Sequence, residues 1–195
     1  CQTIMTAKKY HDYLKKRKWT GLLYRYLFVY PFFVKYLGSN NIDYGCGIVD
    51  FLRFSQYLRF KVHGLDVNAD NVRACQRKLL SAARISDQSI LQGSVDTIVL
   101  DNVLEHIKDP TETLNHIKDL LKRNGSLLVG VPVGDAGYRS DPDHKVYYDE
   151  KKLKDTLDRY GFEEITVFYR PFNSQYLRDN LRQYCFYAVY RKRVV

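Results

Sequence analysis

Strand-like and helix-like hydrophobic patterns alternate along the chain after residue 40, an order typical of a mostly parallel sheet with helices on both faces. The clearest strand is the near-continuous apolar run at 95–100, which suits a strand buried on both faces. No helix pattern of normal length separates the runs at 164–169 and 184–190, so the last strand is predicted to be antiparallel. We predict about seven strands, at 41–45, 61–67, 84–87, 95–100, 126–133, 164–169 and 184–190, and helices at 49–58, 69–82, 109–122 and 149–161.

No internal repeat or low-complexity linker interrupts this pattern, so we expect one α/β domain at 39–195. Residues 1–38 precede the first strand and are predicted to form a helical arm. Its apolar residues keep helical spacing at Leu23, Leu27 and Tyr30, until Pro31 interrupts the pattern.

The composition narrows the class of protein without fixing its fold. The chain has 195 residues, 45% of them hydrophobic and 27% charged, which excludes a disordered or fibrous protein. Its net charge of +9 favours anionic partners such as nucleic acid, acidic lipid headgroups or phosphorylated substrates. Four scattered cysteines, no apolar run of about 18 residues and no signal-peptide pattern together predict a cytoplasmic protein without disulfide bonds.

The most informative motif follows the first predicted strand. Asp43 lies at the end of that strand, and Gly45-Cys46-Gly47 after it lets the backbone approach a ligand closely. A second acid, Asp66, ends the next strand, a position that can accept hydrogen bonds from both hydroxyls of a ribose. The next spaced position is Val49 rather than glycine, so no pyrophosphate cradle is indicated. The pattern favours a nucleoside ligand without phosphates.

Further segments extend this motif in a consistent order. They are 42–47 (IDYGCG), 65–67 (LDV), 96–107 (DTIVLDNVLEHI), 125–132 (GSLLVGVP) and 160–162 (YGF). With them, the chain from about residue 40 onward resembles the class I S-adenosylmethionine-dependent methyltransferases of type 11/12/23, and is similar to the ubiquinone-pathway O-methyltransferases. The resemblance implies a Rossmann-like fold, S-adenosylmethionine as the cofactor and methyl transfer (EC 2.1.1.-).

The resemblance also implies roles for individual residues. The loop under the methionine moiety would consist of Asp43, Gly45, Cys46 and Gly47. Asp66 would bind the ribose, and Val67 and Asp87 would contact the adenine. Asp101 would be the acid beside the sulfonium. Cys46, between two glycines, is expected to be a small packing residue rather than a nucleophile.

Two histidines are candidates for a general base that would deprotonate a hydroxyl acceptor. His106 follows the fourth predicted strand, and His144 lies in the long loop 134–148, a kind of loop that often covers an active site. The alternative is that His106 only caps the next helix or orders this loop. Ubiquinone-pathway and small-RNA 2′-O-methyltransferases look similar here and bind a divalent cation through Glu-x-x-Glu-His and a later histidine. In this chain Asn102 replaces the first carboxylate, so we predict no metal.

The favoured function is O-methylation of a small-molecule or saccharide (glycan) acceptor. An RNA methyltransferase is the first alternative, supported by the charge of +9. It is not favoured, because the Asn-Pro-Pro-aromatic motif of base-amine methyltransferases and recognisable RNA-binding modules are absent from the sequence. The second alternative is a methyltransferase-like protein that binds the cofactor without turnover. The sequence leaves the oligomeric state open.

The arm has two interpretations. It carries eight aromatic residues between 19 and 37 and follows the basic run Lys15-Lys16-Arg17-Lys18. The favoured interpretation is a helical segment that packs on the sheet and closes the cofactor pocket. The alternative is a peripheral membrane contact, in which basic and aromatic residues cooperate on anionic lipid.

Overall fold

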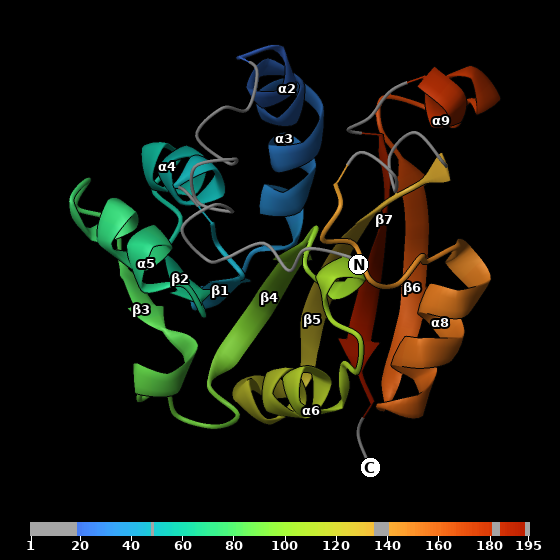
Figure 1. The fold of residues 1–195 in the computed structure, drawn as a ribbon. Coiled ribbons are helices and arrows are strands. Elements are labelled where there is room, and N and C mark those ends of the chain that lie inside the picture. Colours follow the sequence, from blue (N-terminus) through green and yellow to red (C-terminus); the bar gives the residue numbers. More distant parts are fainter. Residues whose placement is uncertain (1–18, 48, 135–140, 181–183, 194–195) are drawn as a thin grey trace. The chain divides into compact units, whose positions relative to one another are not determined.

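The structure, a computed structural model, describes residues 19–47, 49–134, 141–180 and 184–193 (Figure 1). Its strands form one seven-stranded sheet in the order β3-β2-β1-β4-β5-β7-β6, in which β7 is antiparallel to both of its neighbours. The predicted fold class, a mostly parallel Rossmann-like sheet with an antiparallel last strand, is therefore confirmed. The strands are β1 (Asn41–Tyr44), β2 (Val62–Asp66), β3 (Ala82–Arg84), β4 (Val95–Asp101), β5 (Leu121–Pro132), β6 (Phe162–Tyr169) and β7 (Cys185–Lys192).

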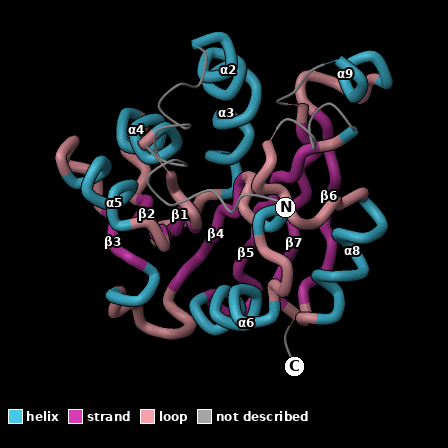
Figure 2. The backbone as a smooth tube through the Cα atoms, in the orientation of Figure 1, coloured by secondary structure: helices cyan, strands magenta, loops and turns pink. Residues whose placement is uncertain are grey.

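The chain divides into two compact units, residues 1–90 and 91–195. In the first unit, β1 pairs with β2 and β2 with β3, all in parallel. Figure 2 shows helices and strands alternating along this part of the chain. Its two connecting helices are α4 (Asp50–Tyr57) and α5 (Ala69–Gln76), and a short 3₁₀ turn, η3 (Ile85–Asp87), follows β3. The predicted division into an arm at 1–38 and a domain at 39–195 stays a prediction.

The segment after α5 differs from its prediction. The helix predicted to reach residue 82 ends at Gln76, and the strand predicted at 84–87 is β3, at 82–84. The chain leaves the helix through Leu79, whose φ of 59° is left-handed, and the Leu80 N–H bonds back to the Cys75 carbonyl. This turn frees the next residues for the sheet, where the Gly64 N–H donates to the Ser81 carbonyl at 2.8 Å. Strand pairing therefore overrides the helical periodicity of residues 77–82.

The described part of the arm is helical and packs on α4. It consists of α2 (Trp19–Tyr24), a π-helical turn η1 (Arg25–Val29), α3 (Tyr30–Phe33) and a 3₁₀ turn η2 (Val34–Tyr36). The Tyr30 ring lies 5.2 Å from the Phe51 ring and 5.4 Å from the Phe54 ring, both on α4. The arm thus has a buried inner face, as the favoured interpretation expected, although the helix α4 is what it contacts. Closure of the cofactor pocket by the arm stays a prediction.

The π-turn lies directly before Pro31. Pro31 has no N–H to donate to the Leu27 carbonyl, so the regular i to i−4 ladder is broken at this point. The Tyr30 N–H bonds instead to the Arg25 carbonyl, five residues back, which is the hydrogen bond that defines a π-turn. The interruption predicted at Pro31 is therefore real, and the helix passes through it by widening one turn.

In the second unit, β4 pairs with β5 in parallel, and β7 pairs with β5 and β6 antiparallel. Its helices are α6 (Thr111–Leu120), α8 (Glu150–Arg159) and α9 (Gln175–Asn180), with a 3₁₀ turn η4 (Leu104–His106). The six-residue α9 lies between β6 and β7, where the sequence showed no helix pattern of normal length. No helix of the described residues is long and apolar enough to cross a membrane.

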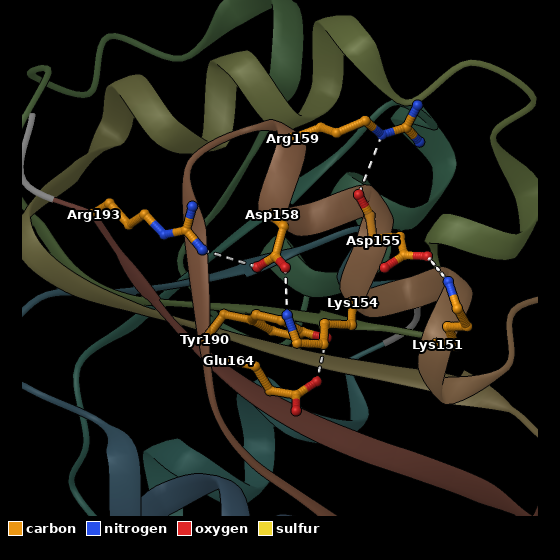
Figure 3. Close-up of polar contacts among 8 residues, drawn as sticks. All are labelled: Lys151, Lys154, Asp155, Asp158, Arg159, Glu164, Tyr190 and Arg193. Carbon is orange, nitrogen blue, oxygen red and sulfur yellow. Dashed lines mark hydrogen bonds and ion pairs between the residues drawn. The ribbon is translucent and has the colours of Figure 1, made fainter.

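Helix α8 shows why its predicted bounds were accurate. The Asp149 side chain accepts the Lys152 N–H at its first turn, and Gly161 follows its end with a φ of 83°. Ion pairs Lys151–Asp155 and Lys154–Asp158 run along its exposed side (Figure 3). The same figure shows the Arg193 guanidinium donating to Asp158, at 3.1 Å, and the Tyr190 hydroxyl donates to Glu164 at 3.2 Å. These contacts join α8 to the residue that follows β7, and β6 to β7.

Candidate functional site

The glycine loop after β1 is held against the end of β2. Both the Gly45 N–H and the Cys46 N–H donate to the Leu65 carbonyl, at 2.7 and 3.0 Å. Gly45 and Gly47 have φ of 80° and 55°, a left-handed region that favours glycine. Asp43, in β1, is 5% exposed. The loop therefore has the backbone turns that its two glycines predicted.

Asp66 fastens this loop to the start of α5. Its Oδ2 accepts the Gly47 N–H at 2.9 Å and the Asn71 side-chain amide at 3.1 Å, and its Oδ1 accepts the Asn68 N–H at 2.7 Å. These bonds hold the Asp66 carboxylate between the glycine loop and the start of α5. The contact of Asp66 with the ribose stays a prediction. Sequence reasoning did not identify Asn68 and Asn71, although Asn68 has the signature of a helix cap.

Val49 keeps the loop's shape despite its side chain. Its φ of 72° lies in the left-handed region, which is a rare conformation for a β-branched residue. It caps the start of α4 and is buried in a cluster with Leu52, Val72 and Cys75. The backbone turn expected of a glycine is thus present, and burial of the valine offsets part of its conformational cost, about 1–2 kcal/mol.

The Cys46 thiol lacks the properties of a nucleophile. It belongs to the same buried cluster as Cys75, and both thiols are free. Its hydrogen bond to Cys75 and its burial raise the pKa of the Cys46 thiol well above the usual value, so the thiolate is disfavoured. The packing is close: at the neighbouring Gly64 even a Cβ would lie 2.8 Å from the Cys46 Sγ, too near to fit without a shift. Cys46 therefore packs, as the sequence suggested.

The two predicted adenine contacts differ in exposure. Val67, directly after Asp66, is 73% exposed, which leaves an apolar surface next to the predicted ribose contact. Asp87 ends η3, close behind β3, and is exposed, with its carboxylate accepting the Ser86 hydroxyl at 2.5 Å. Val67 fits an aromatic base by its position and exposure, whereas for Asp87 only its place after β3 agrees with the expected role. Both roles stay predictions.

In the second unit, Asp101 ends β4 opposite Gly130 of β5. A Cβ at Gly130 would lie 2.8 Å from the Asp101 Oδ1, so the glycine makes room for this carboxylate. The side-chain amide of Asn102 donates to the same oxygen at 2.7 Å, and the Cys185 thiol donates to the Asn102 Oδ1 at 3.3 Å. Asn102, with a φ of 55°, is therefore directed at Asp101 and Cys185.

The structure brings both candidate histidines together. The His106 and His144 rings lie 4.8 Å apart in a T-shaped arrangement. The His106 Nδ1 is 3.4 Å from the Asp143 Oδ2, and the His144 Nε2 is 3.9 Å from the Glu105 Oε1. Each imidazole thus has its own carboxylate neighbour. Asp143 was not singled out by sequence reasoning, although it lies directly beside His144 in the chain.

The loop that carries His144 is anchored at the backbone. The Glu105 carbonyl accepts the N–H groups of Lys145 and Val146, at 2.7 and 3.0 Å. At the start of the segment, the Asp141 Oδ1 accepts the Asp143 N–H at 2.9 Å. Residues 135–140 of the predicted loop lie outside the described residues. The described part, from residue 141 onward, is a fixed turn on η4.

His106 is held in its neutral form. Burial lowers the pKa of its imidazole, and the nearby His144 lowers it further, while Asp141 and Asp143 oppose this shift. A neutral imidazole has a lone pair that can accept a proton at neutral pH. The cluster can therefore act as a general base.

The same cluster has ligand atoms at metal-binding spacing. One ligand atom each of Glu105, His106 and His144 lies within 4.8 Å of the others. Asn102, which occupies the position of a further carboxylate, is engaged with Asp101 and Cys185 instead. Two imidazoles and one carboxylate are a poor ligand set for a hard cation such as Mg²⁺. The absence of a metal stays a prediction.

The strand order and the antiparallel β7 define the fold of class I methyltransferases, and solved structures share it. A S-adenosylmethionine-dependent methyltransferase of Thermotoga maritima, described as a possible histamine N-methyltransferase, matches with a TM-score of 0.72 and 15% identity, over 96% of this chain and 97% of its own. One of Aquifex aeolicus matches with a TM-score of 0.68 and 17% identity, over 96% and 99%. One of Methanosarcina mazei matches with a TM-score of 0.66 and 18% identity, over 87% and 100%. No curated protein sequence matches the chain.

The family described as a methyltransferase domain matches residues 13–167, so the chain belongs to this family. It is a S-adenosylmethionine-dependent methyltransferase (EC 2.1.1.-), as the resemblance implied. The match begins within the arm, whereas the motifs quoted from the sequence began at residue 42.

Proposed function

We propose that this methyltransferase methylates an oxygen atom of a small-molecule or saccharide acceptor. The observation that carries the proposal is the pair of imidazoles, His106 and His144, each beside a carboxylate. A hydroxyl group must lose its proton as it attacks, so an oxygen acceptor benefits more from a general base than an acceptor that is already nucleophilic. A burial-lowered pKa keeps His106 ready for that task.

S-adenosylmethionine, when bound, supplies an electrophilic methyl group on its sulfonium. The residues of the first unit fit its polar and apolar parts: the Asp66 carboxylate, a hydrogen-bond acceptor, ends β2, and the exposed Val67 side chain next to it offers an apolar surface for the adenine. Asp43, Gly45, Cys46 and Gly47 form the loop assigned to the methionine moiety, and Asp101 is assigned to the sulfonium.

Methyl transfer to a hydroxyl group requires one base to take up the hydroxyl proton. The acceptor oxygen forms a bond to the methyl carbon as the sulfur–carbon bond breaks, S-adenosylhomocysteine leaves, and the hydroxyl proton passes to an imidazole nitrogen. Asp143 and Glu105 orient the two rings and stabilise the imidazolium that forms. The reaction needs no metal, in keeping with the place of Asn102.

The test is a screen of hydroxylated small molecules and saccharides, with S-adenosylhomocysteine formation as the readout. With the best acceptor, we expect His106→Asn or His144→Asn to lower kcat by about 10²–10⁴-fold, the usual contribution of a general base. His63→Asn is the matched control, because burial also lowers the pKa of His63, which contacts Ser81 in the other unit. Full activity in both cluster variants would refute the base assignment. If the protein methylates RNA but none of the small molecules or saccharides, the acceptor is RNA instead.

A further inference from the structure

The arm has an apolar outer face, opposite the side chains that pack on α4. Leu23, Leu27 and Phe28 are 47%, 58% and 43% exposed. The half-buried Tyr24 ring lies 5.8 Å from the Phe28 ring and extends this face. We call these four residues the outer face of the arm.

The π-turn helps to assemble this face. In a regular α-helix, residues five apart point roughly 140° away from each other, so Phe28 would turn away from Leu23. Because η1 is wound more widely, with Tyr30 bonded back to Arg25, Phe28 is rotated toward the side of Leu23 and Leu27. At the same time Val29, Tyr30 and Phe33 stay buried, at most 2% exposed. The widened turn thus separates the buried apolar face, which packs on α4, from the exposed outer face of the arm.

The charges around this face have one sign. Between residues 13 and 42 the sequence contains six Lys and Arg residues and no Asp or Glu. Four of the six form the run Lys15-Lys16-Arg17-Lys18, which precedes α2 directly and lies outside the described residues. Lys35, at the other end of the arm, is exposed. An apolar helix face flanked by cations and free of carboxylates complements an anionic, partly apolar surface.

We propose that the outer face of the arm docks on the surface of an anionic phospholipid bilayer. The helix lies in the plane of the interface, with Leu23, Leu27 and Phe28 entering the boundary between headgroups and acyl chains. The positive charges that the sequence places in and before the arm add attraction to anionic headgroups. Trp19 is the first residue of α2 and directly follows the basic run in the sequence.

The experiment uses the whole chain of 195 residues and its own fluorescence. Trp19 is the one tryptophan of the sequence, so its emission reports on the arm. With vesicles of phosphatidylcholine and phosphatidylglycerol we expect a blue shift and co-sedimentation, and with pure phosphatidylcholine neither. Binding should weaken by about tenfold or more when salt rises from 0.05 to 0.5 M, on the order expected when several cations contact a charged surface.

The variant Leu27→Asp places a charge in the centre of the outer face and should reduce vesicle binding by about tenfold or more, because an exposed leucine contributes most of its transfer free energy at an interface. Leu79→Asp is the matched control: Leu79 is also an exposed leucine of the first unit, outside the arm, and should leave binding unchanged. Binding of S-adenosylhomocysteine by both variants verifies that they are folded.

Three results would overturn the proposal. They are no binding to anionic vesicles, equal binding to both kinds of vesicle, and equal loss in the two variants. A concentration-dependent dimer that Leu27→Asp dissociates, without any vesicle binding, would assign the face to a second copy of the chain instead.

Discussion

Hydrogen bonds hold both the glycine loop of the first unit and the histidine cluster of the second. The residues that these bonds bring together are separated by different lengths of sequence. In the loop, Asp66 and the Leu65 carbonyl bond directly to the glycine backbone, 19 residues away for the pair Gly47 and Asp66. In the cluster, His106 and His144 come from segments 38 residues apart and meet because the Glu105 carbonyl anchors the second segment. A local motif therefore specifies the loop, whereas the cluster depends on how a long connection docks.

Among substitutions in the glycine loop and its partners, the largest effect on cofactor binding is expected at Asp66. Asp66→Ala removes the acceptor of three protein hydrogen bonds and leaves the Gly47 and Asn68 N–H groups without it. Binding of S-adenosylhomocysteine should weaken by about 1.5–3 kcal/mol, or roughly 10- to 150-fold, the usual contribution of a charged acceptor. Calorimetric titration measures this loss.

Asp87→Ala is the control for that titration. Asp87 is exposed and lies after β3, and its removal should change binding far less. If Asp66→Ala binds like the wild type, the glycine loop does not depend on this carboxylate and the cofactor assignment of Asp66 is wrong.

The sequence predicted the loop better than the cluster, for physical reasons. Gly45 and Gly47 indicate left-handed backbone directly, because other residues pay for that conformation. The sequence could not show that Val49 also adopts left-handed backbone. The conformational cost is offset by burial of the Val49 side chain in a cluster that forms only in the folded protein. The end of α5 was placed too late for a similar reason, since the pairing of Gly64 with the segment after it is a tertiary contact.

The cluster was predicted only as two separate candidates. The sequence identified His106 and His144 as candidates. The 4.8 Å distance between their rings depends on two backbone hydrogen bonds to the Glu105 carbonyl, and no sequence pattern indicates these bonds. The partner Asp143 was missed for the same reason. Long loops are hard to predict because their conformation is set by what they dock on.

A smaller effect is expected at Gly130, beside Asp101. In Gly130→Ala the new Cβ would lie 2.6 Å from the Tyr187 ring and 2.8 Å from the Asp101 carboxylate. Overpacking of this kind should lower the free energy of unfolding by about 1–3 kcal/mol. Chemical denaturation measures it. The added substitution Tyr187→Leu should recover part of the loss, and a purely additive double variant would show that the ring is not the obstacle.

The pH dependence separates the cluster from the loop. His106 must be neutral to accept a proton, and its pKa is lowered, so the acid limb of kcat/KM should lie below about pH 6.5, the ordinary histidine value. Removing the like charge in His144→Asn should raise the pKa of His106, whereas Asp143→Asn removes an influence that raises it and should lower it further.

NMR titration of the imidazole signals follows these pKa changes without an acceptor. Shifts in the same direction for both variants would contradict the electrostatic account of the cluster. Asp66→Asn should leave the titration of His106 unaltered, because no charge of the glycine loop contributes to its shift.

The smallest effect is expected from removing metal ions. Treatment with EDTA, followed by gel filtration, should leave the turnover of an oxygen acceptor unchanged, because Asn102 is bonded to Asp101 and Cys185, and the group at ligand spacing, Glu105, His106 and His144, has only one carboxylate. Added Mg²⁺, Mn²⁺ or Zn²⁺ should not raise it either. If EDTA abolishes turnover and one of these ions restores it, Glu105, His106 and His144 act as ligands, because their atoms within 4.8 Å are the one such group among the described residues. The variant His106→Asn then decides between the two roles: as a base it lowers kcat at every metal concentration, whereas as a ligand it is rescued by excess metal.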